Sequence, residues 1–292
     1  MDQVVFLNGE YLPLAEAKVP VLDRGFIFGD GVYEVVPVYS KVAFRLDEHL
    51  ARLERSLAAV GIRNPYTREQ WRGFVEGIVA RQSFEDQAVY FQVTRGVAKR
   101  DHAFPKNAQP TIFMMSNPLV PPPAAQVEAG AAAITGRDYR WQRCDIKSIS
   151  LIGNVLLRQL SIEADAVETI LFRDGRLTEA SASNVFVVKG GVIQSPPKNE
   201  LILPGITYDV VVELARSHAL PLEFGDIHEA EVRAADEIWV TSSSKEVLAV
   251  VRLDGAPVGD GRPGPVFRRM YRLYQDFKQK VMRAGRRESL PA

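Results

Sequence analysis

Two stretches in the first half of the chain show the apolar spacing of amphipathic helices. Behind Asp47, a suitable N-cap, leucines recur every three or four residues until Gly61 can end the helix. Behind Thr67, Trp71 and Phe74 begin a second pattern at i, i+3, i+4, i+7 and i+8. The apolar positions of the first stretch are Leu46, Leu50, Leu53, Leu57 and Val60. We therefore expect two helices, each with one buried face.

The same half contains patterns typical of strands. Asn8-Gly9, within residues 6–11, supplies the two positive-φ residues that a tight hairpin turn needs. Residues 88–96 and 111–116 are rich in β-branched and aromatic side chains, and a polar loop separates them. This half is predicted to be α+β.

Residues 117–123 hold four prolines, which disfavour a packed element, so we place a domain boundary there. The length of 292 residues also suggests about two domains. The predicted organisation is an N-terminal α/β domain over 1–117, a linker over 118–123 and a C-terminal domain over 124–292. Turn signals at 173–176, 189–191 and 253–255 punctuate short strands and predict a mostly antiparallel second domain. Helices are expected after Gly205, around 229–235 and over about 265–283.

Composition narrows the function classes. Hydrophobic residues make up 46% and charged residues 25%, which is typical of globular proteins. Lys plus Arg and Asp plus Glu are both 36, so no overall field attracts nucleic acid or an anionic membrane. A single cysteine, Cys144, excludes an intrachain disulfide and suits a reducing compartment. No apolar run approaches about 18 residues and no signal peptide is evident, so we expect a cytoplasmic protein.

Several catalytic signatures are missing from the chain. It has no GxxxxGK[ST] loop, no GxGxxG after a strand, no HExxH and no GxSxG. Its histidines, His49, His102, His218 and His228, are too scattered to suggest a zinc site. We expect no metal.

Two residues in the second half, Lys147 and Glu179, could have catalytic roles, although their spacing alone does not favour such roles over surface positions. Lys147 follows an extended-looking stretch and precedes a helical pattern, and spacing favours a surface lysine. Glu179 precedes small residues and an apolar strand. It could pair with a cofactor ring nitrogen, or it could be a solvated residue at a strand start.

Possible anion-binding groups come from three places. Pro204-Gly205 opens a helix whose first N–H groups, with the Thr207 hydroxyl, could bind phosphate, although an ordinary helix start fits equally. Residues 241–244 read TSSS after a strand and could add hydroxyls or form a polar turn. Arg52 shares a helix row with His49 and could reach a buried anion or be exposed.

The polar loop between the two predicted strands carries Arg100 and His102. Because these residues are two positions apart, their side chains could point the same way and together bind a carboxylate. Alternatively, the arginine could be a surface residue that contributes to solubility.

In order and spacing, these motifs resemble the fold-type IV pyridoxal-phosphate enzymes, most closely the D-amino acid aminotransferases. The resemblance runs nearly end to end. It is carried by FLNGEYLP, DRGFIFGDGVYEVVPVY, HLARLERS, QVTRGVAKRDHAFP, CDIKSISLIGNVL, EASASNVF, LPGIT and TSSSKE.

The resemblance implies a pyridoxal 5'-phosphate cofactor held on Lys147 as a Schiff base, with Glu179 at the pyridine nitrogen. Arg52 would hold the phosphate. The remaining phosphate contacts would come from Ile206, Thr207, Ser242 and Ser243. It further implies a smaller N-terminal α/β domain, a larger barrel-like C-terminal domain with the cofactor between them, and a homodimer in which loops complete the partner's site.

Within the family, Tyr33, Arg100 and His102 match the trio that binds the substrate α-carboxylate in D-amino acid aminotransferases. The implied reaction is ping-pong transamination between D-alanine, D-aspartate or D-glutamate and pyruvate or 2-oxoglutarate. The alternatives are a branched-chain L-amino acid aminotransferase, an aminodeoxychorismate lyase and, last, a non-catalytic binding protein. Ala182 departs from the D-type pattern, in which a third serine is common.

Overall fold

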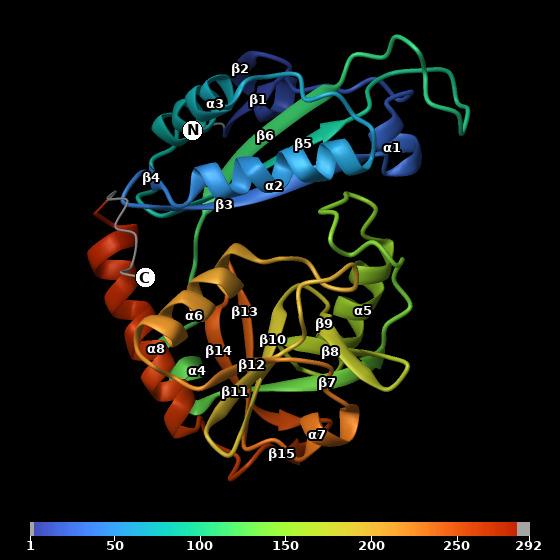
Figure 1. The fold of residues 1–292 in the computed structure, drawn as a ribbon. Coiled ribbons are helices and arrows are strands. Elements are labelled where there is room, and N and C mark those ends of the chain that lie inside the picture. The colour runs from blue at the N-terminus through green and yellow to red at the C-terminus, as the bar shows by residue number, and fades with distance from the viewer. Residues whose placement is uncertain (1–2, 285–292) are drawn as a thin grey trace. The chain divides into compact units, whose positions relative to one another are not determined.

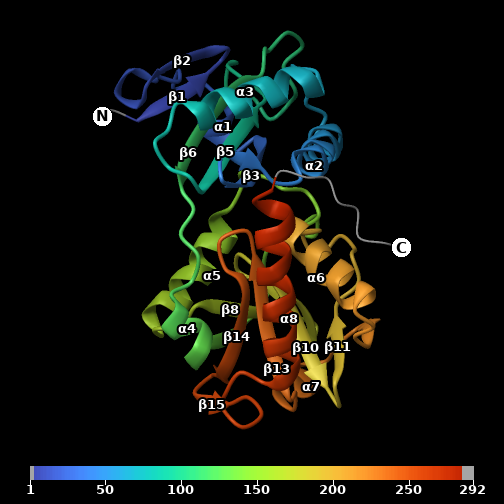
Figure 2. The same cartoon turned by 90° about the vertical axis from the view of Figure 1, so that its left-hand side faces the viewer.

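The computed structural model describes residues 3–284, and their contacts divide the chain into two compact units. Residues up to Val120 form the first unit together with Ile146–Leu151 and 282–284. The second unit comprises Pro121–Asp145 and 152–281. The sequence-based boundary puts all of 124–292 in the second domain, whereas the contacts of Ile146–Leu151 place that segment in the first unit. Figures 1 and 2 show the elements of each unit.

The first unit is built on a six-stranded antiparallel sheet with the order β2-β1-β6-β5-β3-β4. Its helices α2 and α3 supply the apolar faces that cover the sheet. The strands are β1 (Val4–Leu7), β2 (Glu10–Pro13), β3 (Gly31–Tyr39), β4 (Val42–Ala43), β5 (Gln87–Thr94) and β6 (Thr111–Pro118). The helices are the 3-10 turn η1 (Leu14–Glu16), α1 (Arg24–Phe28), α2 (Leu46–Ala59) and α3 (Arg68–Ala80).

Most local predictions for this unit are confirmed. The hairpin turns at Asn8 and Gly9, whose φ angles are 51° and 104°. Thr67 caps α3 with a capping box, and the leucines of α2 are buried. The predicted cap of α2 is wrong, because the N-cap is Arg45. Asp47 lies in the first turn, where its carboxylate accepts a hydrogen bond from Arg72 at 2.5 Å.

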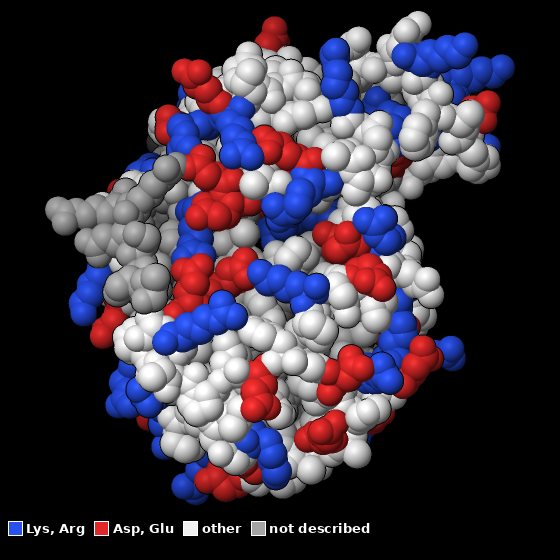
Figure 3. All heavy atoms as spheres, in the orientation of Figure 1, with Lys and Arg blue, Asp and Glu red and all other residues white. Residues whose placement is uncertain are grey.

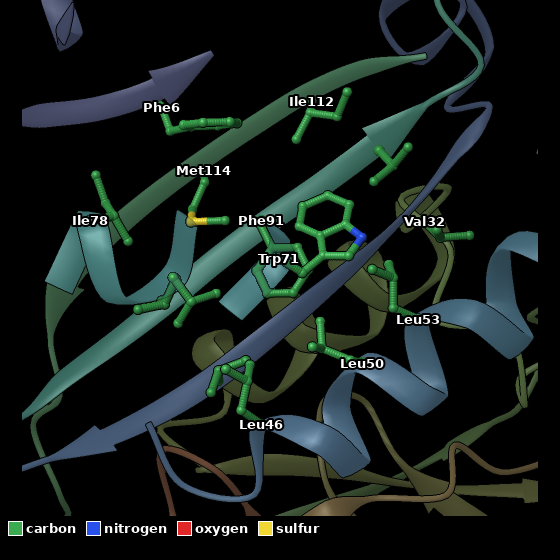
Figure 4. Packing of buried hydrophobic residues seen from close by; sticks show 14 of the residues in the cluster. Phe6, Val32, Leu46, Leu50, Leu53, Trp71, Ile78, Phe91, Ile112 and Met114 are labelled. Atoms are coloured by element: carbon green, nitrogen blue, oxygen red, sulfur yellow. The ribbon is translucent and has the colours of Figure 1, made fainter. Parts of the chain in front are cut away.

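The core of the first unit lies between the sheet and the two helices. Trp71 of α3 stacks on Phe91 of β5 with ring centroids 5.3 Å apart, and both side chains are fully buried (Figure 4). Leu50 and Leu53 of α2 reach the same cluster. This packing fixes α2 against β3, the pair of elements that carries several candidate site residues.

The proline-rich segment is shorter than predicted at its start. Asn117 and Pro118 belong to β6, where they pair with Ala88 and Gln87. Proline is tolerated because it is the last residue of the strand, where a missing N–H costs little. Irregular chain follows until α4 begins at Ala124.

The second unit contains a nine-stranded mixed sheet with the order β12-β11-β10-β13-β14-β7-β8-β9, and β15 pairs with β14. Most pairs are antiparallel, as predicted, but β7 pairs in parallel with β8 and β14, and β11 with β12. The strands are β7 (Ala131–Arg137), β8 (Glu168–Arg173), β9 (Arg176–Ala180), β10 (Asn184–Lys189), β11 (Val192–Ser195), β12 (Leu222–Phe224), β13 (Glu237–Ser242), β14 (Glu246–Leu253) and β15 (Ala256–Pro257).

Helices α6 and α8 pack against β13. All three helices predicted for this half are present. The helices are α4 (Ala124–Ala129), α5 (Ile152–Glu163), α6 (Ile206–Ser217), α7 (Glu229–Arg233) and α8 (Pro265–Phe277), followed by a π-helical turn, η2 (Lys278–Met282). The α+β fold class is confirmed.

Within the described part of the chain, no helix is both long and apolar enough to cross a membrane. On the face shown in Figure 3, basic and acidic side chains are interspersed. This agrees with the equal numbers of the two kinds of charge in the sequence.

Candidate active site

Lys147 lies in the short segment that joins the first unit, and its backbone is held on two sides. Its carbonyl accepts a hydrogen bond from the Tyr33 N–H at 2.9 Å, and its own N–H donates to the Ser56 hydroxyl at 3.3 Å. The Nζ atom lies 4.1 Å from the centroid of the Tyr33 ring. The segment is irregular, because only Ser148 makes a bridge, to Val32. The half-buried residue is therefore placed against β3 and α2, with its amine over Tyr33 of β3, rather than at the end of a strand.

A buried charged cluster lies on β3 and α2. The fully buried Glu34 carboxylate accepts from Arg52 Nε and Nη2, both at 2.8 Å, and contacts His49 Nδ1 at 2.8 Å. Sequence reasoning selected His49 and Arg52 but missed Glu34. The signal was available, because a lone carboxylate interrupts the apolar strand at residues 31–39.

The cluster has a defined charge state. Burial alone would raise the pKa of Glu34, but Arg52 and His49 outweigh it and hold that pKa well below its usual range. Burial lowers the pKa of His49, and the Glu34 carboxylate only partly opposes this shift. A neutral His49 then donates from Nδ1, which leaves Nε2 as a buried atom that lacks a hydrogen-bond partner.

This arrangement predicts acid sensitivity. Because the pKa of His49 is lowered by folding, its contribution to stability is present above the unfolded value of about 6.5 and is lost as pH falls through the folded value. The free energy of unfolding in urea should therefore decrease between pH 7.5 and pH 5. His49→Asn keeps a donor near Glu34 but does not titrate, so its pH dependence should be flatter.

The control for this experiment is His218→Asn, which changes an exposed histidine and should retain the wild-type pH dependence. An unchanged pH dependence in His49→Asn would contradict the assignment of acid sensitivity to this residue.

Arg100 and His102 lie in the exposed loop between β5 and β6 and share one aromatic neighbour. The Arg100 guanidinium carbon is 5.4 Å from the centroid of the Phe28 ring, and the His102 ring centroid is 5.5 Å from it. Tyr33 instead contacts Tyr90, at 5.6 Å between ring centroids, and Lys147. The structure thus brings Arg100 and His102 together around Phe28 and places Tyr33 beside Lys147.

Glu179, at the end of β9, is a buried carboxylate with several donors. Arg140 Nη1 donates to its Oε1 at 2.5 Å, and the Leu203 N–H donates to its Oε2 at 3.0 Å. Asn184 Nδ2 lies 3.3 Å from the same Oε2. Burial raises the pKa of Glu179, and Arg140 and the Leu203 N–H oppose that shift. The residue is therefore neither exposed nor solvated, contrary to the simpler interpretation of its position.

The second unit also presents a set of anion-binding donors. Helix α6 begins after Gly205, and no side chain caps its N-terminus. Thr207 in its first turn is buried. A Cβ atom on Gly205 would lie 2.3 Å from Asn184 Oδ1. Any side chain at this position would therefore clash with Asn184, which contacts Glu179. Helix α6 packs against β13, which ends at Ser242.

These donors fit a phosphate group. Free N–H groups at a helix N-terminus and nearby hydroxyls are the groups that bind phosphate in proteins. Ile206 and Thr207 begin the helix, and Ser242, the last residue of β13, and Ser243, the first of the turn after it, are half-buried. Ser242 Oγ accepts from the Lys245 N–H at 3.1 Å, which holds the turn in place.

Sequence reasoning missed a second buried carboxylate near this turn. Glu168 accepts hydrogen bonds from the hydroxyls of Ser181 and Ser183 and from Lys245 Nζ at 3.0 Å. Ala182 between the two serines is exposed. Ser181 and Ser183 point inward and Ala182 points outward, as in an extended segment. That alternation in the sequence could have suggested that the two serines share a buried hydrogen-bond partner.

Among residues 3–284, no group of three or more His, Cys, Asp or Glu side chains is arranged to hold a metal ion.

Comparison with known proteins places the chain among aminotransferases. The family described as amino-transferase class IV matches residues 31–253. The D-alanine aminotransferase of Bacillus licheniformis is 39% identical over 272 residues, covering 93% of this chain and 96% of that protein. The D-alanine aminotransferase of Listeria monocytogenes serotype 1/2a (strain 10403S) is 37% identical over 282 residues, or 96% of both chains.

Solved structures agree on the fold. A branched-chain aminotransferase from the thermophilic archaeon Thermoproteus uzoniensis, with norvaline, has a TM-score of 0.86 and 24% identity, covering 98% of this chain and 97% of that chain. An Escherichia coli branched-chain amino acid aminotransferase has a TM-score of 0.87 and 21% identity, covering 100% and 98%. At these identities the likeness concerns the fold alone.

Proposed function

Because the chain belongs to the class IV aminotransferase family, we propose that it transfers amino groups between D-amino acids and 2-oxo acids, using pyridoxal 5'-phosphate. The similarity to D-alanine aminotransferases supports this choice, since it extends over more than nine tenths of both chains. Within the structure, the observation that carries the proposal is the half-buried Lys147 amine held over the Tyr33 ring. The substrates would be small acids such as D-alanine, D-glutamate, D-aspartate, pyruvate and 2-oxoglutarate, and the single cysteine suits a cytoplasmic location.

The residues present fit this cofactor. Lys147 would bind it covalently through Nζ, and Glu179 would face its ring nitrogen. The proposed phosphate ligands are Arg52, Ile206, Thr207, Ser242 and Ser243. The helix start and hydroxyls described above are suitable donors, and Arg52, already paired with Glu34, would add a positive charge to the phosphate site.

When bound, pyridoxal phosphate supplies an electron sink for the charge left on the substrate Cα. Lys147 Nζ, once released from its covalent bond, would take the Cα proton as a general base and return it as a general acid. A carboxylate at Glu179 would keep a proton on the ring nitrogen, with Arg140 stabilising the negative charge of that carboxylate. Lys147 would serve both half-reactions in turn, and the first keto acid would leave before the acceptor acid binds, so we expect ping-pong kinetics.

We assign recognition of the substrate α-carboxylate to Arg100, His102 and Tyr33. Arginine offers a planar pair of donors, so Arg100→Ala should remove an interaction worth about 1.5 to 3 kcal/mol. We expect kcat/KM for D-alanine to fall roughly tenfold to a hundredfold in steady-state assays. An amine substrate without a carboxylate should show a much smaller loss, because it never used these donors.

The same assay tests the alternatives. If Arg100→Ala leaves D-alanine kinetics unchanged, or if the wild type prefers L-leucine to D-alanine, the branched-chain interpretation replaces this one. Release of pyruvate and an aromatic amine from aminodeoxychorismate, without a keto acid acceptor, would indicate the lyase.

We also propose that the protein is a homodimer. Helix α5 exposes an apolar stripe at helical spacing, with Ile152, Val155 and Leu156 exposed by 72%, 57% and 51%. A second copy of the chain would cover this stripe. Val155→Glu combined with Leu156→Glu should shift the molecular mass measured by light scattering to that of a monomer. Val120→Glu, at another exposed apolar position outside this helix, is the control, and a double variant that remains dimeric would contradict this interface.

A further inference from the structure

The loop that carries Arg100 and His102 lies at the surface of the first unit. Residues 97–110 are mostly exposed, including Phe104 at 63%. Apart from a bridge between Val97 and Asp23, the loop is irregular between β5 and β6, so a sheet ladder does not hold residues 98–110. Its conformation therefore depends on individual contacts with neighbouring residues, and these determine where the two side chains lie.

Arg24 makes the contact at the centre of this loop. Its side chain is 5% exposed, and its Nη1 donates to the Asp101 carbonyl at 2.5 Å and lies 3.4 Å from the Ala103 carbonyl. Asp101 is the residue between Arg100 and His102. The Arg24 guanidinium carbon also lies 4.8 Å from the centroid of the Phe28 ring, which Arg100 and His102 contact as well.

The Arg24 guanidinium is itself fixed. Its Nε donates to Asp30 Oδ2 at 2.7 Å, and Arg95 binds the same carboxylate through Nε at 2.7 Å and Nη2 at 2.9 Å. Arg95 continues to the carbonyls of Val60 and Gly61 after helix α2. The Arg24 N–H donates to the Gly96 carbonyl at 2.9 Å, so the base of the loop is anchored by the same residue. The loop is thus connected to the residues that follow α2 through largely buried, ion-paired side chains.

We infer that Arg24 is a positioning residue for substrate specificity, which holds Arg100 and His102 where they can receive a substrate carboxylate. This inference rests on the proposed function. Arg24 would not touch the substrate, because its Nε and Nη1 are occupied by Asp30 and by the loop carbonyls. It acts through the backbone at residues 101–103.

The geometry requires an arginine. Nε and Nη1 of one planar group point toward two different acceptors, a carboxylate and a carbonyl. A lysine has a single nitrogen and can keep the charge beside Asp30 only by giving up the loop. Arg24→Lys therefore preserves the ion pair and removes the contact under test.

The first measurement follows the loop itself. Hydrogen exchange of the amides at residues 98–104 should become faster in Arg24→Lys, whereas exchange in β5 and β6 should be unchanged if the variant is folded. Arg158→Lys is the matched control, because Arg158 Nη1 likewise donates to two backbone carbonyls, those of Ala166 and Val167. Unchanged exchange at 98–104 would overturn the inference.

The second measurement compares D-alanine with D-alaninamide, which replaces the carboxylate by a neutral amide. In Arg24→Lys, KM for D-alanine should rise roughly fivefold to tenfold with a smaller change in kcat. For D-alaninamide, kcat/KM should change by less than about twofold. An equal loss for both substrates would show general damage and reject the inference.

Two further outcomes keep the test decisive. If Arg24→Lys does not fold, Phe28→Leu changes the shared ring while keeping apolar bulk, and the same difference between the two substrates is expected. If the wild type does not transaminate D-alanine, the proposed function fails, whereas the exchange experiment still decides whether Arg24 positions the loop.

Discussion

Lys147→Ala is expected to abolish transamination. The substitution removes both the covalent attachment of the cofactor and the group that moves the Cα proton, so turnover should fall by a factor of about 10⁴ or more. The phosphate ligands remain, and the cofactor should still bind noncovalently. Steady-state rates with D-alanine and 2-oxoglutarate measure the loss.

A covalent readout accompanies the rate. After borohydride reduction, the wild-type peptide that contains residue 147 should carry the added mass of the cofactor, and the variant should carry none. Lys189→Ala, which changes a surface lysine paired with Asp236, is the control and should behave as wild type. Near-normal turnover in Lys147→Ala without an added amine would show that another lysine is the catalytic one.

Glu179→Gln should lower turnover more than cofactor affinity. The glutamine keeps the shape of the side chain but cannot balance a positive charge on the ring nitrogen, so the nitrogen would lose its proton more readily. We expect kcat to fall on the order of a hundredfold, within the range for loss of one electrostatic stabiliser. The dissociation constant of the cofactor should change by less than about tenfold.

The surroundings of Glu179 make this substitution interpretable. Arg140 keeps Asp138 as a partner through two donors, Nε at 2.9 Å and Nη2 at 3.0 Å, so its charge is not left alone when Glu179 is neutralised. Glu223→Gln, at an exposed position, controls for loss of a carboxylate elsewhere. Equal rates for wild type and Glu179→Gln would mean that Glu179 is only a buried strand-end carboxylate.

Local patterns predicted the local structure well. The leucine stripe of α2, the capping box at Thr67 and the turn at Asn8-Gly9 each depend on residues within a few positions of one another. The contacts that define the candidate site do not. Arg140 and Glu179 are 39 residues apart, and Glu34 meets Arg52 only because α2 packs on β3.

Spacing alone therefore favoured a surface position for Lys147 and Arg52. Their proposed roles came from the resemblance to a known family. Such a resemblance carries information about contacts between distant parts of the chain, which the periodicity of a local segment does not. The structure adds what neither supplied, namely the buried partners Glu34 and Glu168 and the different surroundings of Tyr33 and the Arg100 loop.

The placement of Ile146–Leu151 has a consequence for recombining this chain with its relatives. Ile149 N–H donates to the Gly31 carbonyl at 3.0 Å, and Ser148 pairs with Val32, so this late segment completes an element encoded far earlier in the chain. In a chimera with one crossover near residue 120, β3 would come from one parent and residues 146–151, which contain Lys147, from the other. Chimeras that inherit residues 31–33 and 146–151 from the same parent should retain activity more often than those that do not.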